Sequence, residues 1–283
     1  MSRLLRSARP LAELLGRDSL VVRLFRPWYD TVLDVTSGWY GIPWPINGVT
    51  YRVAPRHRYQ MASACDAHLA EWLAERVRPG QTALDVGANV GVYVLQFAHW
   101  SRPDGRVIAV EPNPSARAVL EKHVRLNGLE ERVEIVSAAV GATAGEAALF
   151  FFEDSGMSRL GAPNPTLAGR ATAITVPVVS LDDLCESRAL APDWLFIDIE
   201  GFEIATLAVD RRLLAARRHA MGVVVEMHPD SWEVAGTSRA DAESLFRELR
   251  LRAEPLSGQA DVLATYGHVW LRPDGVTSAP RAF

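Results

Sequence analysis

The fold of this chain is decided by Ala83-Leu84-Asp85-Val86-Gly87-Ala88-Asn89-Val90-Gly91, followed by Val107-Ile108-Ala109-Val110-Glu111-Pro112. Each stretch begins with a continuous apolar run, which is typical of a strand buried on both faces of a parallel sheet. Glycines follow the first run and permit a tight turn and a close approach of ligand to backbone. The second run ends in one acid, Glu111. We therefore expect a strand–turn–helix–strand unit whose loop and acid surround a nucleotide-like ligand.

The spacing within the glycine loop narrows the class of ligand. A pyrophosphate-binding turn uses Gly-x-Gly-x-x-Gly, which brings backbone N–H groups onto phosphate oxygens. This chain has Gly-x-Asn-x-Gly at 87–91, and Asp85 stands where a carboxylate repels phosphate. The pattern favours a nucleoside that carries a cationic amino acid and no phosphates, which describes S-adenosylmethionine (SAM). A nicotinamide cofactor and an ordinary turn with incidental glycines stay open as alternatives.

The composition agrees with a soluble, cytoplasmic enzyme. The chain has 283 residues and a formal net charge of −4, which gives no general attraction for nucleic acid, so we expect no nucleic-acid partner. Its two cysteines, Cys65 and Cys185, match no metal or redox spacing and indicate reduced thiols. No apolar run approaches the roughly 18 residues of a membrane span.

The first 60 residues differ in composition from the rest. Residues 1–26 are rich in leucine and contain six arginines but only two acids, Glu13 and Asp18. This segment could form an amphipathic helix on an anionic membrane surface, giving a peripheral membrane contact. The other interpretation is a helix that packs its leucines on the domain. Tryptophans, tyrosines and prolines then crowd residues 27–45, and these rings could cover a cleft, stack on sugar rings or simply pack in a loop-rich cap.

Strands and helices alternate along the remaining chain. Besides the two strands above, the patterns predict strands at 133–136, 194–201 and 222–229. They predict helices over 62–78, 115–127, about 202–219 and 240–251, and a short helix capped by Ser180. A β excursion is expected at 147–153 and a terminal hairpin around 269–271. This alternation predicts an α/β fold with a parallel sheet flanked by helices.

Two of the predicted strands end in ionisable side chains. Asp198 and Glu200 are two residues apart, so we expect them on the same side of one strand. Glu226 and His228 repeat this spacing on the next strand. Ligands of open α/β sheets bind outside the carboxyl ends of the strands, and unpaired carboxylates are costly to bury. We therefore expect these four residues to act on a substrate, although one or two could merely cap helices.

Methyl transfer from a sulfonium to an alcohol needs a group that removes the alcohol's proton. Asp198 and His228 are the best candidate bases. Alternatively, Asp198, Glu226 and His228 could hold a divalent cation that lowers the pKa of the alcohol, and these ligands suit Mg²⁺ or Mn²⁺ better than zinc.

Taken in order, five motifs resemble the FkbM family of SAM-dependent methyltransferases over roughly residues 60–272. They are Asp-Val-Gly-Ala-Asn-Val-Gly at 85–91, Glu-Pro-Asn-Pro at 111–114, Ser-Leu-Asp-Asp-Leu at 180–184, Ile-Asp-Ile-Glu-Gly-Phe-Glu at 197–203 and Val-Glu-Met-His at 225–228. The resemblance implies a Rossmann-like class I methyltransferase fold. That fold is a seven-stranded, mostly parallel sheet with helices on both faces, whose last strand runs antiparallel. It also implies O-methylation of a hydroxyl on a small metabolite such as a polyketide, or on a sugar or glycan.

The resemblance further implies roles for individual residues. The loop residues Asp85, Gly87, Ala88, Asn89 and Gly91 would surround the methionine end of SAM. Glu111, with Pro112 and Asn113 beside it, would take the ribose hydroxyls. Ser137 and Ala138 would border the adenine, and the loop 155–158 would lie near the acceptor. We expect residues 1–60 to be an extension or cap and residues 61–283 to be the SAM-dependent methyltransferase domain.

One departure from the family pattern keeps another class of function open. Family members often carry a lysine two residues before the acid of the fourth strand, where this chain has Phe196. A protein that binds SAM as a scaffold without catalysis is therefore an alternative to the enzyme.

Overall fold

The computed structural model describes residues 20–62, 64–151, 158–163 and 171–275. Its centre is a seven-stranded sheet with the order β12-β13-β11-β10-β3-β4-β5. Five strands run parallel to one another: β3, β4, β5, β10 and β11. The strand β13 runs antiparallel to both of its neighbours, β11 and β12. The bounds of the seven strands are β3 Thr82–Val86, β4 Arg106–Val110, β5 Val133–Val136, β10 Trp194–Ile197, β11 Gly222–Met227, β12 Leu251–Pro255 and β13 Gly267–Pro273. The predicted class I methyltransferase fold, with its antiparallel last strand, is confirmed.

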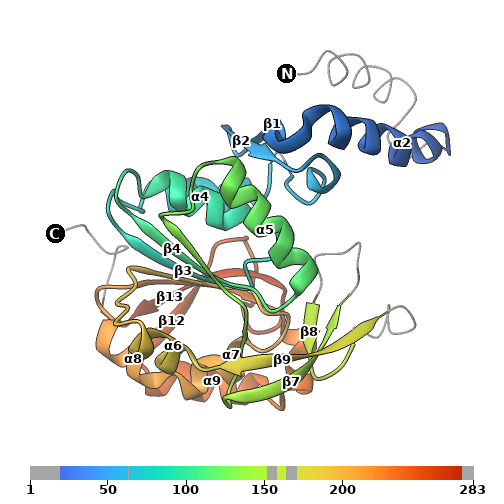
Figure 1. The fold of residues 1–283 in the computed structure, drawn as a ribbon. Coiled ribbons are helices and arrows are strands. Elements are labelled where there is room, and N and C mark those ends of the chain that lie inside the picture. Colours follow the sequence, from blue (N-terminus) through green and yellow to red (C-terminus); the bar gives the residue numbers. More distant parts are fainter. Residues whose placement is uncertain (1–19, 63, 152–157, 164–170, 276–283) are drawn as a thin grey trace.

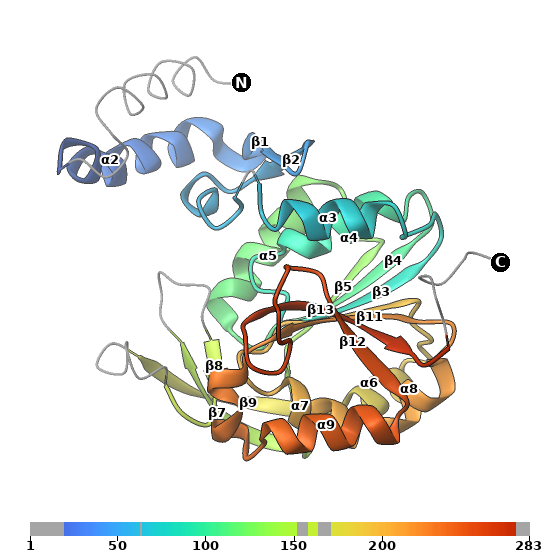
Figure 2. The same cartoon turned by 180° about the vertical axis from the view of Figure 1, so that it is seen from behind.

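Helices cover both faces of this sheet (Figures 1 and 2). One face carries α3 (Ala67–Ala74), α4 (Val92–Trp100) and α5 (Pro114–Leu126), and the other carries α6 (Leu181–Ser187), α7 (Glu203–Val209), α8 (Arg211–Arg217) and α9 (Arg239–Glu248). Alternate side chains of each strand enter different cores. On β3, Leu84 packs with Ile204 of α7, while Ala83 packs with Phe97 of α4. Burial on both faces explains why the parallel strands read as continuous apolar runs.

Two helix boundaries differ from the sequence prediction. The helix expected over 62–78 is confined to α3, because Asp66 precedes it in a left-handed conformation with φ of 41°. The helix expected over 202–219 is divided at Asp210 into α7 and α8. The Asp210 carboxylate is buried there and accepts the N–H of Asp182 at the start of α6. The predicted cap is confirmed, since Ser180 Oγ accepts the N–H of Asp183.

A smaller sheet lies beside the carboxyl ends of the main strands. Its order is β6-β9-β7-β8, with β6 at Ala139–Val140, β7 at Gly145–Phe151, β8 at Ser158–Leu160 and β9 at Thr172–Val179. The expected β excursion is β7, whereas its partners β8 and β9 were not predicted. Residues 155–157 of the proposed acceptor loop lie outside the described residues. Ser158, the last residue of that loop, begins β8.

The N-terminal part is a long helix followed by a hairpin. The helix α2 spans Leu20–Ser37, and the 3-10 turn η1 spans Gly38–Tyr40. The hairpin strands β1 (Ile42–Ile46) and β2 (Val49–Val53) pack against Val90 and Leu95 of the main domain, and the 3-10 turn η2 (Pro55–His57) follows. The loop-rich cap expected here is therefore largely regular structure, and the boundary at residue 60 stays a prediction. Within the described ranges, no helix is both long and apolar enough to cross a bilayer.

Candidate active site

A pocket opens where β3, β4 and β10 end. Residues of all three strand ends line it, together with residues of the smaller sheet. Its lining is Val86, Gly87, Asn89, Val110, Glu111, Pro112, Ala138, Ala139, Val140, Leu149, Ser158, Leu160, Asp198, Ile199 and Glu200. The pocket therefore reaches from the acid after β4 to the acids after β10, as the rule for open α/β sheets requires.

Glu111 forms one end of this pocket. Its side chain is held by two backbone donors: Asn89 N–H donates to Oε2 and Asn113 N–H donates to Oε1, both at 2.7 Å. Burial raises the pKa of Glu111 to about 7, although these two N–H groups oppose the rise. Each oxygen retains a lone pair, so the carboxylate can accept a hydrogen bond from a ribose hydroxyl in the pocket.

The glycines of the loop also serve the packing of the protein, and Gly87 lines the pocket as well. A Cβ on Gly87 would lie 1.8 Å from the carbonyl oxygen of Asp198, and a Cβ on Gly91 would lie 2.5 Å from Cδ1 of Leu120. Both glycines have positive φ, at 89° and 94°. The missing side chain of Gly87 thus lets the loop pass against the carboxyl end of β10. Gly91 lets α4 begin beside α5.

The other predicted cofactor residues fall into two groups. Pro112 and Ala138 line the pocket. Asp85, Ala88, Asn113 and Ser137 are not among its lining residues. Asp85 is 2% exposed, and burial followed by the charge of Glu111 raises its pKa to about 7. Ala88 joins the core beside α4, and Asn113 caps α5 and donates to Ser158 Oγ.

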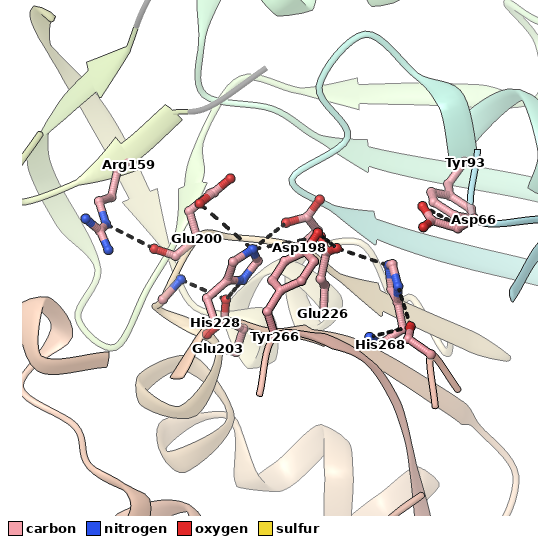
Figure 3. Close-up of polar contacts among 12 residues, drawn as sticks. Asp66, Tyr93, Arg159, Asp198, Glu200, Glu203, Glu226, His228, Tyr266 and His268 are labelled. Carbon is pink, nitrogen blue, oxygen red and sulfur yellow. Dashed lines mark hydrogen bonds and ion pairs between the residues drawn. The ribbon is translucent and has the colours of Figure 1, made fainter. Parts of the chain in front are cut away.

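The four ionisable residues predicted at the strand ends meet in one cluster (Figure 3). Nε2 of His228 lies 3.9 Å from Asp198 Oδ1, 3.8 Å from Glu200 Oε2 and 4.0 Å from Glu226 Oε2. The expectation that Asp198 and Glu200 share one face of a strand is wrong. The strand β10 ends at Ile197, and Glu200 sits in a turn with φ of 52°. Tertiary folding of this turn, rather than strand alternation, brings the two acids together.

Glu203 is hydrogen-bonded to the ring nitrogen of His228 that faces away from the cluster. The sequence motifs did not identify Glu203 as a site residue. Its side chain is completely buried, and Oε1 accepts Nδ1–H of His228 at 2.7 Å and the N–H of Gly201 at 2.8 Å. Oε2 accepts Nε1–H of Trp232 at 3.1 Å. This arrangement assigns the proton to Nδ1 and leaves Nε2 of His228 as the acceptor facing the cluster. Glu203 stands within the motif at 197–203, but no pattern indicated that it would turn toward His228.

The charges of the cluster shift the pKa values of its members in opposite directions. Burial, Glu226 and Glu200 raise the pKa of Asp198 well above its ordinary value, so Asp198 donates a hydrogen bond to Glu226. Burial favours a raised pKa for Glu226, but His268, Asp198 and Tyr266 outweigh it and lower the value. Burial opposes the charge of His228, yet Glu203 and the other carboxylates raise its pKa. One proton is therefore shared between two acids beside a basic imidazole.

Two further residues border the cluster without having been predicted. Tyr266 donates its hydroxyl to Glu226 Oε1, and its ring lies 5.2 Å from the His228 ring. His268 places Nε2 3.5 Å from the same Glu226 oxygen. Both come from the segment around β13, whose sequence spacing gives no signal of its neighbour across the sheet. They fix the orientation of Glu226.

The predicted metal ligands also lie close enough to share an ion. One ligand atom each of Asp198, Glu226 and His228 lies within 4.8 Å of the other two. The hydrogen bond from His228 to Glu203 is of the kind that orients metal-bound histidines, although it orients catalytic bases equally well. The donor set therefore fits a hard divalent cation.

The sequence of this site matches a known family. The family model described as the methyltransferase FkbM domain matches residues 85–253, more than half of the chain. The chain belongs to the FkbM methyltransferase family. The matched range runs from the glycine loop to β12 and contains all the predicted site residues.

Two curated relatives share parts of the FkbM domain. The chain is 38% identical over 81 residues to 31-O-demethyl-FK506 methyltransferase FkbM of Streptomyces tacrolimicus, covering 28% of this chain and 29% of that protein. It is 32% identical over 150 residues to ribosomal RNA large subunit methyltransferase M of Laribacter hongkongensis (strain HLHK9), covering 47% of this chain and 42% of that protein. The matched segments thus span less than half of either relative.

Solved structures include another FkbM protein. The methyltransferase FkbM from Methylobacillus flagellatus KT superposes with a TM-score of 0.46 at 14% identity, covering 77% of this chain and 53% of that chain.

Proposed function

We propose that this FkbM protein is an O-methyltransferase that uses SAM to methylate a hydroxyl of a small metabolite or a sugar. The observation that carries the proposal is the continuity of the site. One pocket joins Glu111, a ribose acceptor, to Asp198 and Glu200, and Nε2 of His228 stands 3.8–3.9 Å from those two acids. A cofactor and an acceptor can therefore meet in front of a positioned base.

The pocket has the polarity that SAM requires. Glu111 presents a carboxylate to the ribose hydroxyls, and the apolar side chains of Ala138, Val140 and Leu149 border the region expected for the adenine. The cluster at the other end is acidic, because it holds the carboxyl groups of Asp198, Glu200 and Glu226. An acidic end stabilises a cationic sulfonium and repels phosphate.

The chain's own residues supply the proton chemistry. SAM, when bound, supplies a methyl group on a positively charged sulfur, which the acceptor oxygen takes as the hydroxyl loses its proton. Nε2 of His228 receives that proton, and the Glu203 carboxylate stabilises the resulting imidazolium. The Asp198 side chain, which lines the pocket, orients the acceptor hydroxyl there.

A divalent cation is the second candidate for activating the same hydroxyl. The observation that favours it is the mutual proximity of the ligand atoms of Asp198, Glu226 and His228. Mg²⁺ or Mn²⁺ held there would lower the pKa of the acceptor alcohol. His228 would then be a ligand instead of a base. EDTA should therefore abolish methyl transfer if the cation activates the hydroxyl, and should leave it unchanged if His228 is the base.

The first experiment measures binding of SAM and S-adenosylhomocysteine by calorimetry, with NAD as the control nucleotide. Micromolar affinity for the first two and none for NAD supports the cofactor assignment. Absence of SAM binding would contradict the proposal and leave the scaffold interpretation without its ligand. The second experiment follows transfer of a labelled methyl group from SAM to pools of hydroxylated acceptors, with and without EDTA.

The acceptor test includes ribosomal RNA. One curated relative is named as a ribosomal RNA methyltransferase, whereas the net charge of −4 gives this chain no general attraction for a polyanion. We expect label in polyol, sugar or polyketide hydroxyls and none in RNA. Methylated RNA would refute this part of the proposal. SAM binding without methyl transfer to any acceptor would favour the scaffold.

A further inference from the structure

Exposed apolar side chains gather on one short part of the chain. The described residues contain ten large apolar side chains that are strongly exposed, and six of them lie between residues 24 and 40. They are Trp39 (93%), Leu24, Val35 and Tyr40 (76% each), Trp28 (67%) and Phe25 (64%). The remaining four are scattered over the domain. Such a concentration marks an interaction surface rather than ordinary surface composition.

Helical geometry places these side chains together. At about 100° per residue, Leu24, Trp28 and Val35 fall within roughly 40° of one another around the axis of α2, with Phe25 beside them. Trp39 and Tyr40 continue from the end of the helix in η1. We name these six residues the outer face of α2. In Figures 1 and 2, α2 lies at the periphery of the molecule, beyond the hairpin β1–β2.

The opposite face of α2 is already occupied. Leu33 is completely buried, Asp30 pairs with the buried Arg58 at 2.6 Å, and Asp34 pairs with Arg56 at 2.7 Å. These contacts fix the rotation of α2 about its axis. Leu24 and Trp28 are therefore exposed on the side of α2 that does not pack against the domain.

The charge of the neighbouring sequence indicates what covers the outer face. Residues 1–26 contain six arginines against two acids, although the whole chain carries −4. A helix that combines Trp, Phe and Leu on one side with adjacent arginines is typical of binding in the interfacial layer of an anionic membrane. Trp and Tyr rings favour that layer because they are apolar with one polar tip.

We propose that the outer face of α2 docks on a membrane surface rich in anionic lipid headgroups, to which the positive charge of the sequence of residues 1–26 is complementary. This attachment is peripheral. It does not depend on the proposed O-methylation, since α2 and η1 contribute no residue to the pocket.

The test is flotation of the full-length protein with vesicles of phosphatidylcholine alone and of phosphatidylcholine mixed with phosphatidylglycerol. The variants are Trp28→Glu and Val35→Glu. The matched control is Val209→Glu, because Val209 is also an exposed valine, at 46%, but lies on α7. Circular dichroism confirms that each variant is folded, and light scattering gives the oligomeric state.

We expect the wild type to float with the anionic vesicles, to stay in the soluble fraction with neutral ones, and to detach in high salt. Trp28→Glu and Val35→Glu each weaken binding by roughly tenfold or more, the size of one lost apolar side-chain burial, while Val209→Glu binds as the wild type does. Absence of flotation, or equal flotation of all variants, would overturn the proposal. A dimer that Trp28→Glu dissociates would assign the face to a second copy of the chain instead.

Discussion

Replacing Glu203 by glutamine tests whether this buried side chain sets the protonation of His228. Glu203 Oε1 accepts Nδ1–H of His228 at 2.7 Å, and Glu203 contributes the largest pKa-raising effects on that imidazole, against the opposing effect of burial. The substitution Glu203→Gln keeps the shape of the side chain and one acceptor oxygen but removes the negative charge. We expect the pKa of His228 to fall. If His228 is the base, the acidic limb of the methyl-transfer rate moves to lower pH because less imidazole is protonated there.

The magnitude follows from the type of bond that is lost. A hydrogen bond to a charged group contributes about 1.5–3 kcal/mol, and a pKa difference of one corresponds to about 1.4 kcal/mol. Loss of the charge should therefore lower the pKa of His228, with a loss of about 1.5–3 kcal/mol in the stabilisation of the imidazolium. Glu200 and Glu226 still face Nε2 and oppose a larger fall.

The assay is an NMR titration of the His228 ring, which needs no acceptor, followed by the pH dependence of methyl transfer. Trp232→Phe is the matched control: it removes the donor to Glu203 Oε2 but leaves the bond to His228 in place. We expect the control to keep the pKa of His228 at or above the wild-type value. The double variant Glu203→Gln, Trp232→Phe removes the clash of two donors that the glutamine amide could create. An unchanged pKa of His228 in both glutamine variants would refute the reasoning.

Three further outcomes are expected. Asp198→Asn should abolish turnover while changing SAM affinity only a few-fold, and a large loss of binding in calorimetry would show that Asp198 belongs to the cofactor site. Glu111→Gln should weaken SAM by about tenfold or more, the equivalent of one charge-assisted hydrogen bond; unchanged affinity would refute the ribose assignment. Burial raises the pKa of Asp85 from its ordinary 3.8 to about 7. The folded state therefore binds a proton more tightly than the unfolded state, and the free energy of unfolding falls as the pH rises between about 4 and 7. Asp85→Asn should therefore flatten this dependence and add several kcal/mol of unfolding free energy at pH 8, measured by urea denaturation; an unchanged slope would contradict it.

The glycine loop shows how one motif can carry a second physical reason. The spacing 87–91 predicted the turn and its place beside Glu111, because tight turns and strand ends are local properties. The prediction attributed the glycines to ligand approach; Gly87, which lines the pocket, is also needed for the approach of the Asp198 carbonyl oxygen. The sequence could not show this contact, because the two residues are far apart along the chain.

The cluster around His228 illustrates the same division. The sequence by itself determined the parallel sheet, through apolar runs that only burial on both faces explains, and placed Asp198, Glu226 and His228 at neighbouring strand ends. It did not determine the turn that returns Glu200 to His228, nor the position of Glu203 on α7 behind the imidazole. These depend on the packing of α7 against β11 and η4 (Pro229–Ala235). Periodicity reports which face of an element is buried, but only tertiary packing decides which buried groups meet, and that contact fixes the tautomer of His228.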